Sequence, residues 1–366
     1  MKNIWVLGAG QLGAMLRQAG TPMGLTVKPI AADQALTDLN TLQATDIVTP
    51  EIEAWEQSKV TEQLAQHPNF INRDVFPVIA DRLTQKQTLD RLGVATAKWQ
   101  LVADDISTAA LHDSLGDKVL LKRRRGGYDG RGQHWLNEND NDTIPADFYN
   151  QSIAEQGIQF SAEVSIIGVR NREGTIRFYP LAHNHHVAGI LKASIGAAEQ
   201  FAHLQASAES MLTKVLQGLD YIGVMAMECF VVVDANGDQQ LMVNELAPRV
   251  HNSGHWTQAG SSINQFESHL RAVADLPLGT PVYKGVTVMI NLVGMPYNAK
   301  WLEVPGAEIY WYGKAVRAGR KLGHINFCLP TAAALDQLAA LLPEADHDVI
   351  EWVKQQLTPF FSLSSR

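Results

Sequence analysis

VMAMECFVVVDANGDQQLMVNELAPRVHNSGH, residues 224–255, is the stretch that decides the fold of the central part of the chain. Two strand-like runs in it flank Asn236-Gly237, the dipeptide most typical of a two-residue type I′ hairpin turn. Residues at equal distances from such a turn lie opposite one another on the two strands. The pattern therefore predicts an antiparallel hairpin in which Glu228 directly faces Glu245.

These two opposed glutamates are the first indication of chemistry. Carboxylates directly opposed on neighbouring strands have Cβ atoms about 5 Å apart, where like charges are destabilising unless a cation neutralises them. Mg²⁺ held by one or two carboxylates and by substrate phosphates is the usual arrangement. The alternative is a surface hairpin whose glutamates face water, but Glu228 lies within the apolar run 225–233. We therefore predict that Glu228 and Glu245 bind a divalent metal ion.

Polar residues follow the second strand of the hairpin directly. Arg249, His251 and Asn252 come within a few residues of Glu245, so we expect their side chains at the same site. Three further histidines resemble a zinc cluster, but no cysteine or H-E-x-x-H motif accompanies them. We expect hydrogen-bonding roles for these three, which are His183, His185 and His186.

A basic, glycine-rich segment, KRRRGGYDGRG at residues 122–132, leaves a predicted strand. A basic run is often no more than a solvated face of the protein. Here it enters a loop with four glycines, whose backbone N–H groups suit phosphate oxygens beside a lysine. The chain has no Walker P-loop motif, and an RNA-binding site would need more aromatic residues for base stacking than the nearby Tyr128. The segment therefore predicts a polyphosphate site.

Another glycine-rich motif lies near the N-terminus. GAGQLG at residues 8–13 follows a strand-like run, opens a helix-like segment, and precedes Asp33 by about 20 residues. These features match the dinucleotide fingerprint, yet the motif itself indicates only that the backbone approaches an anion at a helix N-terminus. NAD, another phosphate-bearing ligand and a tight structural turn all remain open at this point.

The 366 residues divide into three predicted regions. Short strand-like runs alternating with helix-like segments predict a doubly wound, parallel α/β domain over residues 1–95. An α+β domain over residues 96–282 follows, and the proline-containing segment 277–281 marks its boundary with a small C-terminal domain over residues 283–366. The strand-like runs are residues 3–7, 25–30, 46–49, 119–122, 224–233, 239–244 and 286–293.

Composition and charge limit the classes of partner. The 30 lysines and arginines against 38 aspartates and glutamates give a formal charge of -8, which argues against a protein committed to nucleic acid or an anionic membrane. No apolar run approaches the about 20 residues of a membrane span. Cys229 and Cys328 both lie beside aromatic or apolar residues, so we expect buried thiols and a reducing compartment. We therefore expect a cytoplasmic protein without nucleic-acid or membrane partners.

Several long motifs follow one another along nearly the whole chain: GAGQLG (8–13), DRLTQK (81–86), RRGGYDGRG (124–132), MAMECF (225–230), NELAPRVHNSGH (244–255) and GRKLGHI (319–325). Together they closely resemble the N5-carboxyaminoimidazole ribonucleotide synthetase family, the ATPase subunit of phosphoribosylaminoimidazole carboxylase. The resemblance implies an ATP-grasp fold, with a pre-ATP-grasp α/β domain, a central ATP-grasp domain and a small C-terminal domain. It also implies a C–N bond-forming ligase of de novo purine synthesis, which uses ATP, 5-aminoimidazole ribonucleotide and bicarbonate to make ADP, phosphate and the N5-carboxylated product through carboxyphosphate.

The same resemblance implies roles for individual residues, with ATP as co-substrate and Mg²⁺ as cofactor. The implied ATP contacts are Arg82, Lys122, Gly127, Tyr128, Asp129, Gly130, Arg131, Gly132, Gln133, Glu155, Gln156, Gly157, Ile158, Glu163, His186, Asn244 and Glu245. Those for the ribonucleotide are Gln11, Glu51, Tyr128, Asp129, Arg131, Lys314 and Arg320. Around bicarbonate and the transferred carboxyl group they are Arg249, His251 and Asn252, and the metal ligands are Glu228 and Glu245. Residues 8–13 would then line the ribonucleotide site instead of binding NAD.

One residue departs from the family pattern: Arg125 stands where a smaller residue such as threonine is expected, so it should modulate the phosphate loop. The resemblance favours a homodimer. The closest competing function is another ATP-grasp ligase or a formate-dependent transformylase with a different acceptor. A dehydrogenase and an RNA-binding module are the alternatives from other classes.

Overall fold

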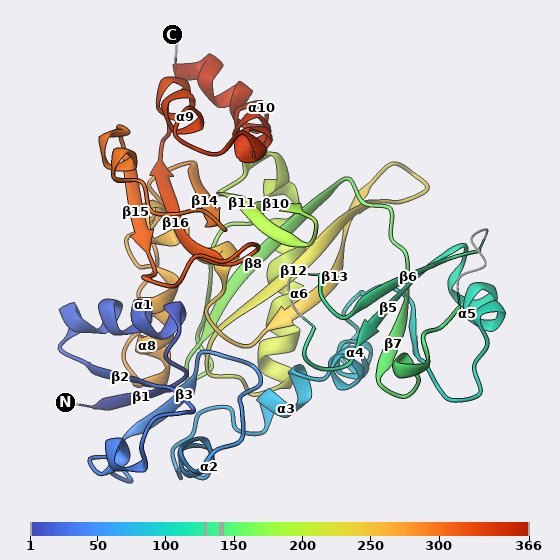
Figure 1. Ribbon diagram of the computed structural model, residues 1–366, viewed down its shortest axis with the longest axis horizontal. Helices are drawn as coiled ribbons and strands as arrows, with labels where there is room; N and C mark the ends of the chain where they lie inside the picture. The colour runs from blue at the N-terminus through green and yellow to red at the C-terminus, as the bar shows by residue number, and fades with distance from the viewer. Residues whose placement is uncertain (1, 128–129, 139–142, 365–366) are drawn as a thin grey trace.

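The N-terminal part of the chain is a parallel α/β unit. A computed structural model describes residues 2–127, 130–138 and 143–364 (Figure 1). In it β1 (Asn3–Leu7) pairs in parallel with β2 (Thr26–Ile30) on one side and with β3 (Ile47–Pro50) on the other. This confirms the predicted strand, glycine turn and helix, because α1 (Gln11–Gly20) begins within the GAGQLG motif. The further helices of this part are α2 (Lys59–Ala65) and α3 (Val75–Ile79).

A small antiparallel sheet forms a separate lobe, on the right of Figure 1. Its strands lie in the order β4-β7-β5-β6, and α5 (Thr108–Leu115) packs apolar side chains against it to form a core of its own. The helix α4 (Arg82–Arg91) precedes the first strand of this sheet in the sequence. The strands are β4 (Trp99–Leu101), β5 (Lys118–Arg123), β6 (Gln133–Asn137) and β7 (Ser152–Gln156).

A large antiparallel sheet runs through the rest of the molecule in the order β13-β12-β8-β10-β11-β14-β16-β15, with β9 beside β8. Strands β14 to β16 belong to the predicted C-terminal domain, yet β14 pairs with β11 and so continues the sheet. The strands are β8 (Ala162–Arg170), β9 (Ile176–Phe178), β10 (Ala182–Val187), β11 (Ile190–Gly196), β12 (Gly223–Val233), β13 (Gln239–Ala247), β14 (Thr287–Val293), β15 (Ala307–Trp311) and β16 (Lys321–Cys328).

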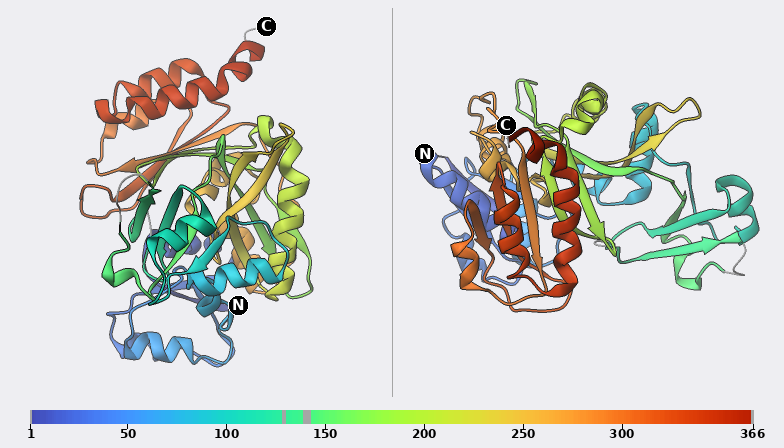
Figure 2. Two further views of the ribbon diagram at one scale, coloured as in Figure 1. Left: turned by 90° about the vertical axis from the view of Figure 1, so that its right-hand side faces the viewer. Right: turned by 90° about the horizontal axis from the view of Figure 1, so that it is seen from above.

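Helices cover both faces of this sheet, because its strands are apolar on both faces. Along β12, Val224 and Ala226 pack in one core with α8 (Gln265–Val273) and α1, whereas Met225 and Met227 pack in another with α6 (Gln205–Gly218). At the far end, α9 (Ala332–Ala339) and α10 (His347–Ser364) lie as one layer against β14 and β16 (Figure 2). The α-helices of the described residues also include the short α7 (Thr257–Gly260).

The β12–β13 hairpin confirms the opposed glutamates and corrects the turn between them. Near the turn the register is shifted by one residue, since Val233 pairs with Gln239 and not with Gln240 as predicted. Asn236-Gly237 is therefore part of a longer loop with Gly237 at φ 90°, not a type I′ turn. A bulge after Glu228 then leaves Asn244 without an opposite residue and shifts the register back. The extra loop residue and the bulge offset each other, so Glu228 still pairs with Glu245.

Cys229 is buried, as predicted, whereas Cys328 is only half-buried because it is the last residue of β16. Both are free thiols. Within the described ranges, no helix combines the length and the apolar character that crossing a membrane requires.

Candidate active site

A buried cluster of charges joins the small sheet to the hairpin strand β13. Lys122 of β5 donates a hydrogen bond to Asn244 Oδ1 over 3.0 Å and pairs with Glu155 Oε2 at 2.8 Å. Glu155 of β7 also pairs through Oε1 with Lys86 of α4 at 2.9 Å. The three charged side chains are between 2% and 7% exposed. Residues predicted to contact ATP from two different sheets thus lie together.

The cluster carries one more positive charge than negative charge. Burial pushes the pKa of Glu155 upward, but Lys122 and Lys86 outweigh it and lower that pKa to about 2. Burial lowers the pKa of Lys86, although the neighbouring Glu155 opposes this. A buried carboxylate held between two lysines therefore stays ionised, and the excess positive charge suits a phosphate group.

Arg82 connects the glycine-rich loop with the predicted metal site. It is the first residue of α4, and its Nη2 donates to the Gly127 carbonyl at 3.1 Å and pairs with Glu245 Oε2 at 3.2 Å. The loop closes on β5, since the Arg123 N–H donates to the Gly132 carbonyl over 2.8 Å. Gly130 approaches the turn between β10 and β11, where Gly189 lies. The described loop residues thus lie beside the buried charge cluster. Gln133 is the first residue of β6, and Arg131 is exposed.

Tyr128 and Asp129, predicted to contact ATP and the ribonucleotide, lie outside the described residues. The predicted adenine segment begins at Glu155 and leaves the small sheet. Its backbone is fixed by two hydrogen bonds, from the Gln156 N–H to the Lys98 carbonyl at 2.9 Å and from the Gly157 N–H to the Lys118 carbonyl at 2.7 Å. Ile158 follows it directly toward β8.

The two glutamates predicted to bind the metal ion face each other on the hairpin. Glu228 is 19% exposed and Glu245 is 38% exposed at the side chain. Burial raises the pKa of Glu228, His186 opposes this, and Glu245 adds to it. The described residues hold no group of three or more histidine, cysteine, aspartate or glutamate side chains placed for a metal ion. The pair therefore fits Mg²⁺ that takes its other ligands from nucleotide phosphates and water.

The three neighbouring histidines have separate tasks. His186 of β10 pairs through Nδ1 with Glu163 Oε2 of β8 at 3.1 Å, so the predicted ribose and nucleotide residues meet. Burial works against protonation of His186, but Glu163 and Glu228 outweigh it and raise its pKa. His183 bonds to the Gln200 side chain at 2.8 Å. His185 differs from the expectation, since it stacks on Trp352 of α10 with ring centroids 4.6 Å apart.

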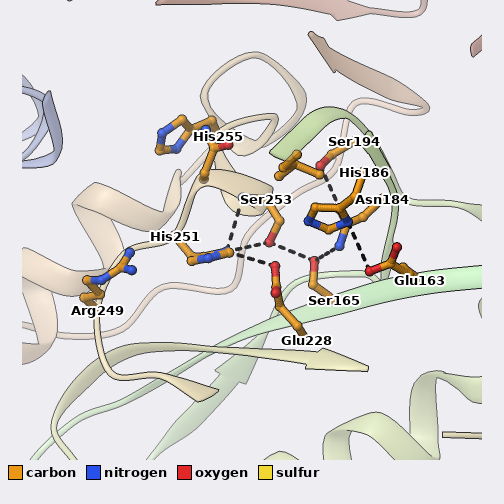
Figure 3. Close-up of polar contacts among 12 residues, drawn as sticks. Glu163, Ser165, Asn184, His186, Ser194, Glu228, Arg249, His251, Ser253 and His255 are labelled. Atoms are coloured by element: carbon orange, nitrogen blue, oxygen red, sulfur yellow. Dashed lines mark hydrogen bonds and ion pairs between the residues drawn. The ribbon is translucent and has the colours of Figure 1, made fainter. Parts of the chain in front are cut away.

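The predicted bicarbonate residues lie just beyond β13, and His251 points toward Glu228 (Figure 3). His251 Nδ1 is 3.8 Å from Glu228 Oε1 and 2.9 Å from Ser253 Oγ. Asn252 forms a reciprocal amide pair with Asn291 of β14, with N···O distances of 3.0 and 2.6 Å. His251 and Asn252 are therefore held in place by buried polar partners at one end of the hairpin.

Arg249 turns to the N-terminal unit. Its Nη2 pairs with Glu53 Oε1 at 2.9 Å. Burial raises the pKa of Glu53, and the charge of Arg249 opposes this. An arginine predicted to hold the carboxyl group is thus neutralised by a carboxylate from the loop after β3.

A pocket of about 520 Å³ lies between the GAGQLG motif and the loop before β16. Glu51 lines it, is 3% exposed, and accepts hydrogen bonds from the N–H groups of Gly10 and Gly13. Gln11 and Lys314 also line it, and Lys314 Nζ donates to Gln11 Oε1. Three of the predicted ribonucleotide residues thus share one pocket, and the amides of the dinucleotide-like motif are occupied by a carboxylate of this chain.

Arg320, also predicted there, is fixed beside the pocket. Its Nη1 donates to the Ala315 carbonyl over 3.2 Å. Arg320 and burial together lower the pKa of Lys314, burial having the larger effect. Two cations so close are suited to a phosphate monoester.

Several residues of the site were not predicted from the sequence. Lys86 lies within the DRLTQK motif, but the motif did not indicate a role for it. Its side chain is buried although α4 is mostly polar. Glu53 lies two residues after Glu51, and only that proximity signals it. Tyr312 lies under the ammonium of Lys314, 5.8 Å from ring centroid to Nζ, and its hydroxyl bonds to His324 Nδ1 at 2.6 Å.

Comparisons with known proteins identify the family of the chain. Residues 87–266 match the ATP-grasp domain, and residues 287–338 match the phosphoribosylaminoimidazole carboxylase C-terminal domain. The N5-carboxyaminoimidazole ribonucleotide synthase of Escherichia coli (strain K12) is 50% identical over 360 residues, which are 97% of this chain and 99% of that protein.

Solved structures give the same result. The N5-carboxyaminoimidazole ribonucleotide synthetase of Thermus thermophilus is 35% identical with a TM-score of 0.80, and the match covers 93% of this chain and 99% of that one. The carboxyaminoimidazole ribonucleotide synthase of Aspergillus clavatus, solved in complex with ATP, is 26% identical with a TM-score of 0.81, covering 96% of this chain and 98% of that one.

Proposed function

The chain belongs to the N5-carboxyaminoimidazole ribonucleotide synthase family of ATP-grasp enzymes, and we propose how its residues divide the work of that reaction. It is a ligase of de novo purine synthesis that uses ATP to carboxylate the exocyclic amine of 5-aminoimidazole ribonucleotide. Bicarbonate is the carboxyl source, and carboxyphosphate is the activated form.

One observation carries the assignment of the phosphoryl-transfer site. Glu245, which lies opposite Glu228, pairs with Arg82 and is next to Asn244, which accepts a hydrogen bond from Lys122. Arg82 and Lys122 bind the phosphates of ATP, and the two glutamates hold Mg²⁺, which neutralises phosphate charge when bound. Phosphoryl transfer requires little from the protein beyond positioning and charge stabilisation, and these groups supply both.

The remaining nucleotide residues extend this site on either side. Glu163 and His186 bind the ribose side of ATP, with Asn244 between them and the phosphates. The loop residues Gly127, Gly130, Arg131, Gly132 and Gln133 cover the phosphates, and residues 155–158 bind adenine. Arg125 is at the edge of this loop, where its Nε is 3.4 Å from Asp81 Oδ2, so it contributes through Asp81 and not by direct phosphate contact.

Bicarbonate and the ribonucleotide lie on opposite sides of the loop after β3. Arg249, His251 and Asn252 hold the carboxyl group, with the guanidinium stabilising negative charge as it develops. Gln11, Glu51, Lys314 and Arg320 bind the ribonucleotide in the 520 Å³ pocket. Its phosphate faces the two cations, and Glu51 provides acceptors for hydroxyl groups.

The test is ADP release with Mg²⁺-ATP, adding the ribonucleotide and bicarbonate separately and then together. Release that requires both, with one carboxylated product per ADP, is expected. Nucleotide binding without turnover that depends on the ribonucleotide would assign this ATP site to a sister ligase with another acceptor. We also propose that the protein is a homodimer, that it is cytoplasmic, and that its domain limits lie near residues 95 and 282. Size measurement in solution and limited proteolysis test the first and the last.

A further inference from the structure

A chain of buried hydrogen bonds ends on His251 (Figure 3). Ser194 of β11 donates through its hydroxyl to Asn184 Oδ1 at 2.7 Å, and Asn184 Nδ2 of β10 donates to Ser165 Oγ of β8 at 3.0 Å. Ser165 Oγ then donates to Ser253 Oγ at 2.8 Å, and Ser253 Oγ is 2.9 Å from His251 Nδ1. Ser194, Asn184, Ser165 and Ser253 are each at most 4% exposed, so water does not compete for these hydrogen bonds.

The donor-to-acceptor direction of these hydrogen bonds determines which nitrogen of His251 carries the proton. A hydroxyl has one proton, and Ser253 Oγ accepts the proton of Ser165, which leaves its own proton available for His251 Nδ1. The backbone N–H of Ser253 also points to Nδ1, at 3.3 Å. A backbone N–H can only donate, so this second contact gives the same direction independently of how the Asn184 amide is oriented. Nδ1 of His251 is therefore an acceptor.

A neutral imidazole whose Nδ1 accepts carries its proton on Nε2. Among the residues that the structure describes, Nε2 of His251 has no hydrogen-bond partner, whereas the side chain as a whole is 15% exposed. Arg249 lies two residues away and Glu228 lies 3.8 Å from Nδ1, so the ring is at the junction of the bicarbonate and metal sites.

We infer that Ser194, Asn184, Ser165 and Ser253 are positioning residues that keep His251 in the Nε2–H form, as a hydrogen-bond donor to the bicarbonate-derived carboxyl group. The inference rests on the proposed function for the identity of the ligand, and on the hydrogen-bond geometry for the tautomer. It also means that His251 does not act as the base that accepts the amine proton, because the nitrogen facing the ligand already carries a proton.

Two amide substitutions separate donation from proton acceptance. Glutamine can place its side-chain N–H₂ near the position of Nε2, whereas asparagine places it near Nδ1. Losing a hydrogen bond to a charged group changes a rate or binding constant on the order of 10- to 100-fold. We expect kcat/KM for bicarbonate to be at least about tenfold higher in His251→Gln than in His251→Asn, with the KM for ATP unchanged in both. Equal losses in both variants would overturn donation by Nε2.

The tautomer itself is measured by ¹⁵N NMR of the full-length enzyme labelled at its 12 histidines, with the His251 signals assigned by their absence in His251→Gln. We expect a protonated Nε2 and an unprotonated Nδ1. Asn184→Asp should weaken the hydrogen-bond series, because a carboxylate only accepts and Ser165 then donates to residue 184 instead of to Ser253. The backbone N–H of Ser253 still donates to Nδ1, so the Nε2–H form should persist while the KM for bicarbonate rises. A protonated Nδ1 in the wild type would overturn the inference.

Further variants keep the result interpretable if the buried carboxylate of Asn184→Asp prevents folding. Ser165→Ala removes the donor to Ser253 and the acceptor of the Asn184 amide, and is expected to raise the KM for bicarbonate without changing that for ATP. Ser207→Ala, at an exposed position, is the matched control and should match the wild type in both. An unchanged bicarbonate KM in Ser165→Ala would contradict the positioning role. ADP release that does not depend on bicarbonate would reject the proposed function and the ligand named here, whereas the tautomer is read without turnover.

Discussion

Glu155→Gln is the substitution that tests the buried charge cluster most directly. It keeps the size and shape of the side chain and removes one negative charge from between Lys86 and Lys122, which are 2% and 7% exposed. Removing one partner of a buried ion pair costs about 3–5 kcal/mol, because the remaining charge stays desolvated. The fall in the pKa of Glu155 from 4.5 to about 2 corresponds to about 3 kcal/mol for the ionised form. Both routes give a loss of about 3 kcal/mol.

The pH dependence has a definite sign. The pKa of Glu155 is lower in the folded protein than in the unfolded chain, so its contribution is complete above the unfolded value of 4.5 and is lost as the pH falls toward about 2. The difference in free energy of unfolding between wild type and Glu155→Gln should therefore be constant from neutral pH down to about pH 5 and shrink below it. A difference that grew with acidity would contradict the assignment.

The assay is urea denaturation together with ATP kinetics. For a slope of about 3 kcal/mol per molar urea, the midpoint should fall by about 1 M. The KM for ATP should rise, since Lys122 loses the acceptor that holds it opposite Asn244. Glu173→Gln, at an exposed position, is the matched control and should change neither quantity. An unchanged midpoint and an unchanged KM for ATP in Glu155→Gln would show that the lysines do not depend on this carboxylate.

Three further substitutions separate the other parts of the site. Glu245→Gln should abolish activity at ordinary Mg²⁺ concentrations, measured as ADP release over a Mg²⁺ titration, and a fully active variant would reject the metal role. Lys314→Ala should raise the KM for the ribonucleotide at least about tenfold by removing a charge-assisted hydrogen bond, and an equal rise in the KM for ATP would contradict this. Glu53→Gln should change the KM for bicarbonate and spare both other substrates, because it loses the ion pair with Arg249. If bicarbonate use is unaffected, Glu53 has no part in placing the guanidinium.

The sequence predicted the pairing of the two glutamates correctly although its account of the turn was wrong. Counting back from Asn236-Gly237 placed Glu228 opposite Glu245, and this is the observed pairing. The count succeeded because the longer loop and the bulge at Asn244 shift the register in opposite directions. Neither irregularity has a local signal strong enough to predict, since a bulge depends on what the neighbouring strand and its ligands require. Here the bulged residue is Asn244, whose side chain binds Lys122.

The N-terminal motif shows the opposite case, in which a correct local prediction left the ligand open. The strand, the glycine turn and the helix α1 are all present, and a Cβ on Gly8 would overlap with the Glu51 side chain. The donors of the helix N-terminus are occupied by this carboxylate, 41 and 38 residues away along the chain for Gly10 and Gly13. A motif indicates that an anion is bound, but only the fold shows that the anion belongs to the protein.

The loop after β3 explains why Glu53 could not be found from the sequence. Glu51 and Glu53 are the same residue type, two positions apart, in a segment without regular structure. Periodicity therefore cannot say which way either side chain points. The partner of Glu51 is the helix N-terminus of its own unit, whereas that of Glu53 is Arg249, which follows a strand of the large sheet. Their different roles are set by how the α/β unit packs against that sheet, and long-range packing of this kind leaves no pattern in the sequence around either glutamate.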